Sequence, residues 1–311
     1  MIHGIALHCG VVRTKMNVEE ISVPRDILLH IQNNMAAFSK GQKRIAAFIL
    51  QSYDKAAFMT ASKLGKTTDV SESTVVRFAA ELGYDGYPAM QKALQEMIRN
   101  KLTAVQRIEV ADDRIGDRDI LPMVFQSDIE KIRMTMEELD RVSFAGAVKA
   151  ITAAKRIYIL GVRSATALAS FLGFYFNLIF DNVVQVHSNS ASEMFEQLLR
   201  VGEGDVVIGI SFPRYSRRTV QALYFAHDRG ATVVAITDSP TSPLAERADH
   251  TLLAKSDMAS FVDSLVAPLS LVNALIVAVG RQKKEDLSQT FETLEKIWDE
   301  YEVYEKVEHE D

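Results

Sequence analysis

Two short segments combine arginine with serine in a way that is suited to binding an anion. The first segment is 161–164, Gly-Val-Arg-Ser, and the second is 211–216, Ser-Phe-Pro-Arg-Tyr-Ser. Each follows an apolar run and precedes a helical pattern, so the free N–H groups and the dipole of a helix N-terminus would reinforce anion binding. The cations in or beside the segments are Arg163, Arg214, Arg217 and Arg218. A lone serine there would only cap its helix, but two such loops together favour an anion site.

Alternating strands and helices would position these loops. Short apolar runs predict strands at 156–160, 183–186, 206–210, 232–236 and 251–253. Helical stretches such as 165–180 and 217–229 lie between them, which predicts a parallel sheet covered on both faces. The expected fold is a three-layer, doubly wound α/β domain with the flavodoxin-like strand order 2-1-3-4-5. Strands one and three are then neighbours, and their two loops meet in one crevice.

The N-terminal third of the chain has only helical patterns. Two helices joined by a tight turn are predicted between residues 60 and 82, with Ser71 capping the second helix by accepting from the N–H of Ser73 or Thr74. One face of that helix is apolar, and the other presents Ser73, Thr74 and Arg77. Small polar residues and an arginine could approach the groove of DNA closely. An amphipathic helix in an unrelated bundle is the alternative.

Charge is unevenly distributed along the 311 residues. The whole chain has a net charge of −6. Residues 1–110 hold 14 Lys and Arg against 10 Asp and Glu, whereas residues 111–311 hold 21 against 31. A basic front and an acidic rear indicate that a polyanion would meet the front.

Composition excludes several classes of protein. The single cysteine, Cys9, rules out an internal disulfide framework and a clustered thiolate zinc site. We expect neither a metal nor a cofactor. No apolar run reaches the roughly 18 residues that span a bilayer. Residues 2–12 make a poor signal peptide, and both Met1 and Met16 are possible starts. We expect a cytoplasmic protein.

These patterns predict five segments. A weakly structured stretch over 1–24 precedes a helix-turn-helix DNA-binding domain over 25–100. A polar linker over 101–118 leads to a ligand-sensing domain over 119–282, which begins with helices at 119–139 and 143–154. The last segment, 283–311, contains an acidic amphipathic helix at about 285–305. Its apolar seam would either dock onto its own domain or be shared between subunits.

The predicted second helix and its tail carry a resemblance to a known family. Residues 70–78, Val-Ser-Glu-Ser-Thr-Val-Val-Arg-Phe, and residues 82–87, Leu-Gly-Tyr-Asp-Gly-Tyr, closely resemble the DNA-binding domain of RpiR-type (MurR/RpiR) bacterial regulators. The resemblance implies that Ser71, Ser73, Thr74 and Arg77 face DNA, and that Tyr84, Tyr87 and Lys92 lie near backbone phosphates. Gly65 departs from the pattern, because a helix former is expected there.

Residues 130–280 resemble the sugar isomerase (SIS) domain, which binds phosphosugars in isomerases, synthases and RpiR-type regulators. The strand at 205–210 with its serine loop and the segment 230–238 carry the likeness. The resemblance implies that Ser164, Ser211 and Ser216 supply ligand hydroxyls. The usual loop, Ser-x-Ser-Gly-x-Thr, is altered here, with Pro213 at the second serine and Arg214 at the glycine. Arg214 could bind a phosphate, fill the pocket or select a carboxylate.

Together these features predict a transcriptional regulator rather than an enzyme. Its partners would be a double-stranded DNA operator and a small anionic metabolite, a phosphosugar or a sugar acid, with no role for a membrane. SIS domains commonly pair, so a homodimer or homotetramer is expected. The alternative is a sugar-phosphate aldose–ketose isomerase, whose acid or base would come from His187, Glu193 or His250. No paired acid and base is evident, so no catalytic residue is predicted.

Overall fold

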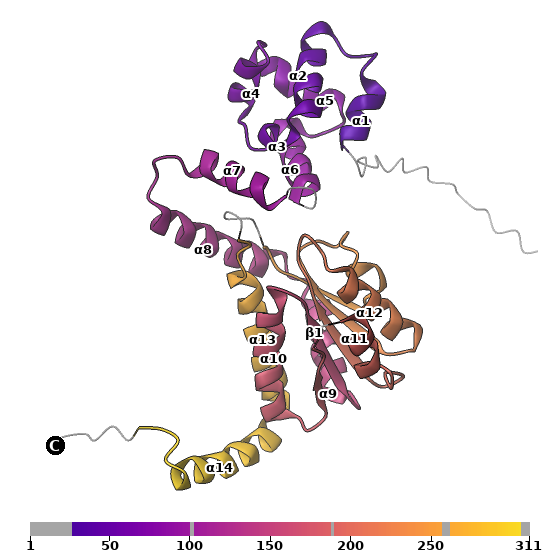
Figure 1. The fold of residues 1–311 in the computed structure, drawn as a ribbon, viewed down its shortest axis with the longest axis vertical. Coiled ribbons are helices and arrows are strands. Elements are labelled where there is room, and N and C mark those ends of the chain that lie inside the picture. Colours follow the sequence, from indigo (N-terminus) through magenta and orange to yellow (C-terminus); the bar gives the residue numbers. More distant parts are fainter. Residues whose placement is uncertain (1–26, 100–102, 188–189, 257–261, 306–311) are drawn as a thin grey trace, which may run out of the picture. The chain divides into compact units, whose positions relative to one another are not determined.

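The structure is a computed structural model that describes residues 27–99, 103–187, 190–256 and 262–305 (Figure 1). The chain divides into two compact units, with the division after Met97. Cys9, Met16 and the segment 1–24 lie outside the described residues. Within the described ranges, no helix has the length and apolar character needed to cross a membrane.

The N-terminal unit is entirely helical, as predicted. Its helices are α1 (Ile27–Asn34), α2 (Lys40–Gln51), α3 (Tyr53–Ala56), α4 (Ala61–Thr67), α5 (Glu72–Glu81) and α6 (Gly86–Arg99). A small apolar core holds them together, and its fully buried members include Ile31, Ile45, Ile49, Leu64, Phe78, Met90 and Leu94. Phe38 packs edge-on against Phe78, with ring centroids 5.1 Å apart. This core fixes α5 by its apolar face.

The segment predicted as a linker, 101–118, instead contains a helix, α7 (Ala104–Ile115). Thr103 begins it with a capping box, in which the Thr103 hydroxyl accepts from the Gln106 N–H and the Gln106 side chain accepts from the Thr103 N–H. Gly116, at φ 51°, ends it. The polar composition favoured a linker, but Thr-x-x-Gln is also a helix-start signal. Residues 104–115 of the predicted linker therefore form a helix.

The C-terminal unit contains a five-stranded parallel sheet in the order β2-β1-β3-β4-β5, which confirms the predicted fold. The strands are β1 (Ile157–Gly161), β2 (Val183–Gln185), β3 (Val206–Ile210), β4 (Thr232–Thr237) and β5 (His250–Leu253). All five residues of β1 and of β3 are buried, as is typical of the central strands of a parallel sheet. The carboxyl ends of these two neighbouring strands lie together because Gly161 pairs with Ile210.

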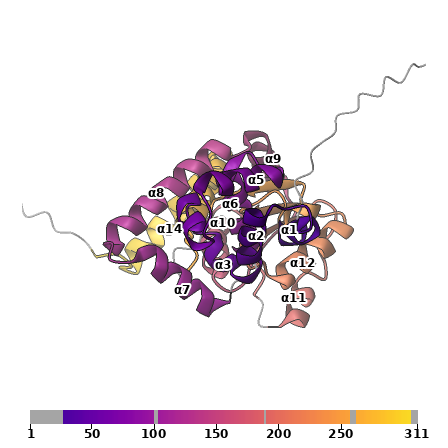
Figure 2. The ribbon, with the colours of Figure 1, turned by 90° about the horizontal axis from the view of Figure 1, so that it is seen from above.

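Helices cover both faces of the sheet. On one face are α9 (Arg141–Ala153), α10 (Ala165–Ile179) and α13 (Val266–Gln282), and on the other are α11 (Ala191–Gln197) and α12 (Arg217–Asp228). Figure 2 shows α9 on the opposite side of the unit from α11 and α12. Alternate residues of β1 enter the two cores, with Ile157 and Ile159 in the first and Tyr158 and Leu160 in the second. A 3-10 turn, Ala245–Arg247, precedes β5. The three-layer architecture follows from this alternation.

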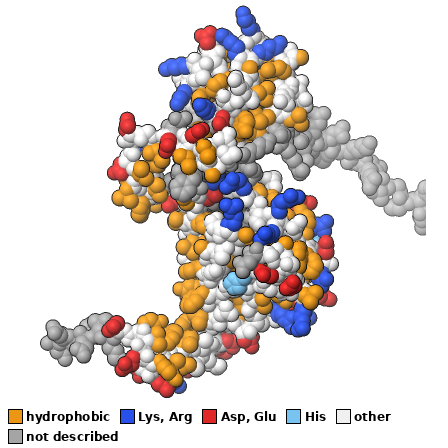
Figure 3. All heavy atoms as spheres, in the orientation of Figure 1, with side chains coloured by type: hydrophobic (Ala, Val, Ile, Leu, Met, Phe, Trp, Pro, Cys, Tyr) orange, Lys and Arg blue, Asp and Glu red, His pale blue; other side chains and the backbone are white. Residues whose placement is uncertain are grey.

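Two further helices of this unit leave apolar side chains exposed. α8 (Ile120–Glu138) begins at Asp119, whose carboxylate accepts from the Leu121 N–H. Its exposed apolar residues are Ile120, Leu121, Phe125, Ile129, Ile132 and Met136. α14 (Lys284–Glu300) contributes no fully buried residue, and Leu287 is its one residue that packs against the core. Figure 3 shows hydrophobic atoms exposed along both helices.

Candidate functional site: DNA-reading helix and anion cavity

A close turn joins α4 to α5. The Val70 N–H donates to the Gly65 carbonyl at 2.8 Å, and Asp69 adopts a φ of 53°. A Cβ atom at position 65 would lie 2.9 Å from the Val70 carbonyl oxygen, so the turn needs a glycine there. The expectation of a helix former at Gly65 was wrong. Glycine is a poor helix former, but the close packing of the turn leaves no room for a side chain at this position. This packing fixes where α5 starts.

The N-terminus of α5 presents a cluster of hydroxyl groups. The Ser71 hydroxyl accepts from the Thr74 N–H at 3.3 Å, which is one of the two predicted caps. Its oxygen also lies 2.9 Å from the Ser73 hydroxyl and 2.8 Å from the Thr74 hydroxyl. Arg77 lies one turn later and is exposed, with its Nε donating to the Ser73 carbonyl at 3.3 Å. Ser71 and Ser73 are exposed and Thr74 is half-buried. The structure thus brings all four predicted residues to one exposed surface.

The two tyrosines predicted to lie near DNA phosphates are buried. Tyr84 and Tyr87 are only 7% and 4% exposed. Burial raises the pKa of Tyr87 to about 12, so its hydroxyl stays protonated at neutral pH, and it donates to the Met59 carbonyl at 2.7 Å. The Tyr84 hydroxyl is buried without a hydrogen-bond partner among the described residues, and burial raises its pKa. These tyrosines support the fold, whereas Lys92 is exposed on α6.

The N-terminal unit has exposed cations on α2, α3, α4 and α6. They are Lys40, Lys43, Arg44, Lys55, Lys63, Lys66 and Lys92. Arg44 donates to Asp69 in the turn before α5, at 2.6 Å. Both side chains are exposed, so this ion pair is screened by solvent. The remaining cations could contact a polyanion without sequence preference.

In the C-terminal unit, the two predicted anion-binding loops meet at one cavity of about 800 Å³. All five predicted ligand residues line it, namely Arg163, Ser164, Ser211, Arg214 and Ser216. The volume falls within the range of roughly 300–1,000 Å³ that small-molecule sites occupy. Arg214 lines the cavity without filling it, which removes one of the three roles considered for this residue.

Two serines of the cavity accept local hydrogen bonds through hydroxyls that can still donate, and one of them, Ser216, caps α12. The Ser211 hydroxyl accepts from the Ser216 N–H at 3.0 Å, and the Ser216 hydroxyl accepts from the Thr219 N–H at 3.4 Å. Because a hydroxyl can accept and donate at the same time, each can also donate a hydrogen bond to a bound anion. Ser164, before α10, makes no capping hydrogen bond. The capping and ligand-binding roles are therefore compatible.

The lining of the cavity is strongly cationic. Its arginines are Arg107, Arg163, Arg214, Arg217 and Arg218, and its one carboxylate is that of Asp263. Among the residues that the structure describes, Arg163, Arg214 and Arg217 form no ion pair. Figure 3 shows Lys and Arg side chains gathered near this end of the unit. Arg107 was missed in the sequence, because it belongs to α7 and no local signal connects it with the two loops.

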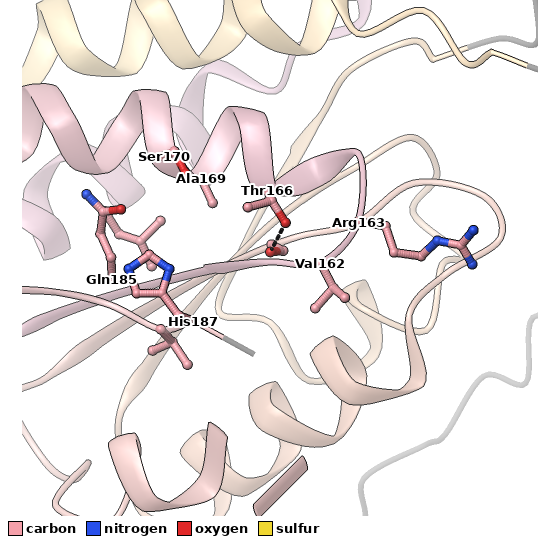
Figure 4. Close-up of a pocket in the computed structure, with 10 residues that line it drawn as sticks. Val162, Arg163, Thr166, Ala169, Ser170, Gln185 and His187 are labelled. Atoms are coloured by element: carbon pink, nitrogen blue, oxygen red, sulfur yellow. Dashed lines mark hydrogen bonds between the residues drawn. The ribbon is translucent and has the colours of Figure 1, made fainter. Parts of the chain in front are cut away.

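A second cavity, of about 150 Å³, adjoins the first on the β2 side and shares Val162 and Arg163 with it. Figure 4 shows Gln185 and His187 together on one side and Arg163 extending away from them. Thr166 also lines it, and its hydroxyl donates to the Gly161 carbonyl at 3.0 Å. The arginine that the two cavities share therefore extends away from the polar residues of the smaller one.

The three residues considered for isomerase chemistry are not brought together. His187 lines the small cavity, whereas Glu193 is exposed on α11 and lines neither cavity. His250 begins β5, where the strand register puts it level with Ile208 in the middle of β3, away from the carboxyl ends that carry the loops. Its ring packs against Gly146 of α9. In the described ranges, no group of three or more His, Cys, Asp or Glu residues could hold a metal ion.

Two comparisons with protein families match the two units. Residues 25–101 match the helix-turn-helix domain of the rpiR family, and residues 150–278 match the SIS domain. The HTH-type transcriptional regulator HexR of Escherichia coli is 26% identical over 280 residues, which cover 86% of this chain and 94% of HexR. An uncharacterized HTH-type transcriptional regulator of Haemophilus influenzae is 27% identical over 277 residues, covering 85% and 92%.

Solved structures show the same relationship. The sugar isomerase domain of an RpiR transcription factor from Sphaerobacter thermophilus is 30% identical, with a TM-score of 0.55, and the match covers 57% of this chain and 99% of that one. The NanR protein of Vibrio vulnificus, complexed with ManNAc-6P, is 24% identical with a TM-score of 0.54, and the match covers 88% and 99%. The chain described here therefore belongs to the RpiR family of HTH-type transcriptional regulators and combines a DNA-binding helix-turn-helix domain with a SIS domain.

Proposed function

We propose that this regulator binds a double-stranded DNA operator through α5 and that a small anionic metabolite in the large cavity changes its affinity for that operator. The observation that carries the proposal is the cavity lining, which has five arginines against one carboxylate in an otherwise acidic part of the chain. Such a lining attracts an anion of metabolite size. The operator contacts would come from Ser71, Ser73, Thr74 and Arg77, with Lys92 near the backbone.

A phosphosugar is the ligand class that we favour. Helix N-termini and arginines are suited to a phosphate group, and the Ser164, Ser211 and Ser216 hydroxyls are suited to its oxygens. The ManNAc-6P complex of NanR, a protein of the same fold, supports this class. The exchange of glycine for Arg214 also suits a carboxylate, so a sugar acid is the second candidate. The two differ in charge and geometry, and a binding panel separates them.

Sensing accounts for the cavity better than isomerisation does. An aldose–ketose isomerase needs a carboxylate or histidine poised beside the sugar carbons. Of the described residues that line the large cavity, only Asp263 carries a carboxylate, and it forms an ion pair with Arg107 at 2.9 Å. An isomerase would also have no use for the helix-turn-helix domain.

We further propose that the regulator acts in the cytoplasm as a homodimer or homotetramer. The exposed apolar face of α8 supports this, because contiguous apolar surface of this kind marks association surfaces. Paired subunits would present two α5 helices to half-sites one DNA turn, or a multiple of it, apart. The ligand must bind the two arrangements of these helices with different affinity if it is to switch operator binding.

A thermal-shift panel with the full chain tests the ligand class. The compounds are inorganic phosphate, ManNAc-6P, glucose 6-phosphate, gluconate and uncharged glucose. We expect stabilisation by a phosphosugar or by the sugar acid but not by glucose, and we expect Ser211→Ala with Arg214→Ala to abolish it. Arg141→Ala, which removes an exposed arginine outside the cavity, is the matched control and should retain it. An equal shift in the double variant would place the ligand elsewhere.

A further inference from the structure

We infer that Arg107 is an additional anion-binding residue of the large cavity and that it makes α7 responsive to the bound ligand. The inference rests on the proposed function of the cavity and extends it to a helix outside both loops. Arg107 is 2% exposed and lines the same cavity as Arg163 and Arg214. It reaches this position from the segment that connects the helix-turn-helix domain to the sheet.

The position of Arg107 is set by the periodicity of α7. Val110 and Ala111, three and four residues further on, are 5% and 1% exposed, so they share one buried face with Arg107. Val105 and Ile108, on other faces of the helix, are 64% and 43% exposed. The arginine therefore lies on the inner side of the helix instead of extending into solvent, as an arginine usually does.

The hydrogen bonds of Arg107 are incomplete. One terminal nitrogen donates to the Asp263 carboxylate at 2.9 Å, whereas the buried Nε has no partner among the described residues. A guanidinium has five N–H donors, and buried donors are rarely left unsatisfied. A phosphate or carboxylate in the adjoining cavity would supply the missing acceptors through charge-assisted hydrogen bonds.

Asp263 would hold Arg107 in place until the anion arrives. It carries the one carboxylate of the cavity lining, and its side chain is 23% exposed, so solvent reaches it. An incoming anion would be repelled by Asp263 and attracted by Arg107, and these two forces favour exchange of partners. Arg107 belongs to α7, the helix that follows the DNA-binding domain in the chain. When the anion replaces Asp263 as the partner of Arg107, the contact that anchors α7 therefore changes.

Titration with inorganic phosphate at constant ionic strength tests the contact. Two variants lack the carboxylate and differ only in the guanidinium, namely Asp263→Asn and Asp263→Asn with Arg107→Gln. We expect the first to bind phosphate at least as tightly as the wild type, and the second to bind at least about ten-fold more weakly than the first. Equal binding by the two variants would overturn the inference. Circular dichroism checks that both variants are folded.

If the unpaired Arg107 prevents folding of Asp263→Asn, then Arg107→Lys carries the test, because it retains the charge but loses the planar fork. This variant should bind phosphate several-fold more weakly than the wild type, and wild-type affinity would contradict the inference.

Hydrogen exchange measures the response of α7. Phosphate should slow exchange over residues 104–115 in the wild type, and this protection should be absent when Arg107 is replaced. Protection that persists would overturn the coupling.

The phosphate titrations also distinguish a failure of this inference from a failure of the proposed function. Should the wild type bind phosphate, and Arg214→Gln weaken that binding while the Arg107 comparisons show no change, only the role of Arg107 is wrong. Should the wild type bind neither phosphate nor any compound of the panel, the proposed function itself is wrong. Where a panel compound binds and phosphate does not, that compound replaces phosphate in the same titrations.

Discussion

The two units of this regulator both use serines at helix N-termini beside arginines, but they present them differently. At the start of α5, Ser71, Ser73 and Arg77 are exposed on a convex helix surface. Between β3 and α12, Ser211 is buried, Ser216 caps α12, and the neighbouring arginines line a hollow. The same chemistry therefore suits a long polyanion in one unit and an enclosed small anion in the other.

The hydrogen bonds of the serine hydroxyls also differ between the two units. In α5 the capping serine also contacts two neighbouring hydroxyls, all at the helix surface. In the C-terminal unit the Ser211 hydroxyl accepts from the backbone N–H of Ser216, five residues later, and this bond shapes the loop around the cavity. Capping by serine thus tells little about function by itself, and the surrounding surface, convex or hollow, decides what can bind.

Arg77→Ala should have the largest effect on DNA binding, because Arg77 lies on the exposed surface of α5. Loss of an arginine that contacts a guanine edge or a phosphate should weaken operator binding by about 1–3 kcal/mol, or roughly 5- to 150-fold. Fluorescence anisotropy with an upstream duplex measures it. Lys55→Ala, which removes an exposed cation from α3, is the matched control and should have a much smaller effect. Unchanged affinity for Arg77→Ala would remove this residue from the reading surface.

Phe125→Asp on α8 should separate subunits, because it introduces a charge into the exposed apolar face. We expect light scattering at micromolar concentration to give a smaller mass, and operator affinity to fall because two linked readers bind more tightly than one. Gln126→Asp adds the same charge at the adjacent exposed position and is the control. A wild type that is already monomeric would contradict the proposed pairing.

Gly65→Ala should destabilise the DNA-binding unit. The added methyl group would meet the Val70 carbonyl oxygen at 2.9 Å, and relief of such overpacking costs about 1–3 kcal/mol. Thermal unfolding should show the loss in the transition of the N-terminal unit. Ser62→Ala, earlier in α4, should change stability by less than about 0.5 kcal/mol. An unaltered unfolding temperature for Gly65→Ala would show that the turn can relax without cost.

Tyr87→Phe and Lys92→Ala should separate support of the fold from contact with DNA. Removal of the Tyr87 hydroxyl leaves the Met59 carbonyl with one donor fewer, so we expect a loss of stability of about 1 kcal/mol with operator affinity retained. Lys92→Ala should leave stability unchanged. It should reduce the slope of the logarithm of the binding constant against the logarithm of salt concentration by about one. The opposite pattern would return Tyr87 to the DNA surface.

Much of the fold could be predicted because its signals are local. The strand at 206–210 was predicted with the bounds that β3 has, and the order 2-1-3-4-5 followed from short right-handed connections. The meeting of the loops at 161–164 and 211–216 followed from that order, because neighbouring parallel strands end at the same edge. Periodicity and topology were sufficient for these features.

The features that were missed depend on packing between distant residues. Arg107 and Asp263 are 156 residues apart in the chain, and nothing in the composition around either one connects them. The burial of Tyr84 and Tyr87 could not be predicted, because a sequence motif does not distinguish a buried aromatic residue from an exposed one. Gly65 departed from helix propensity because a carbonyl of the following turn approaches it. Each of these depends on three-dimensional contacts.

Operator binding measured with and without the cavity ligand, at one fixed salt concentration, tests the central claim most directly. We predict that the wild type binds an upstream duplex and that the ligand identified by the thermal-shift panel changes its affinity by roughly 5- to 150-fold. Ser211→Ala with Arg214→Ala should bind the same duplex but show no change with ligand. A wild type that ignores the duplex at low salt, or a bound ligand that leaves operator affinity unaltered, would contradict the account.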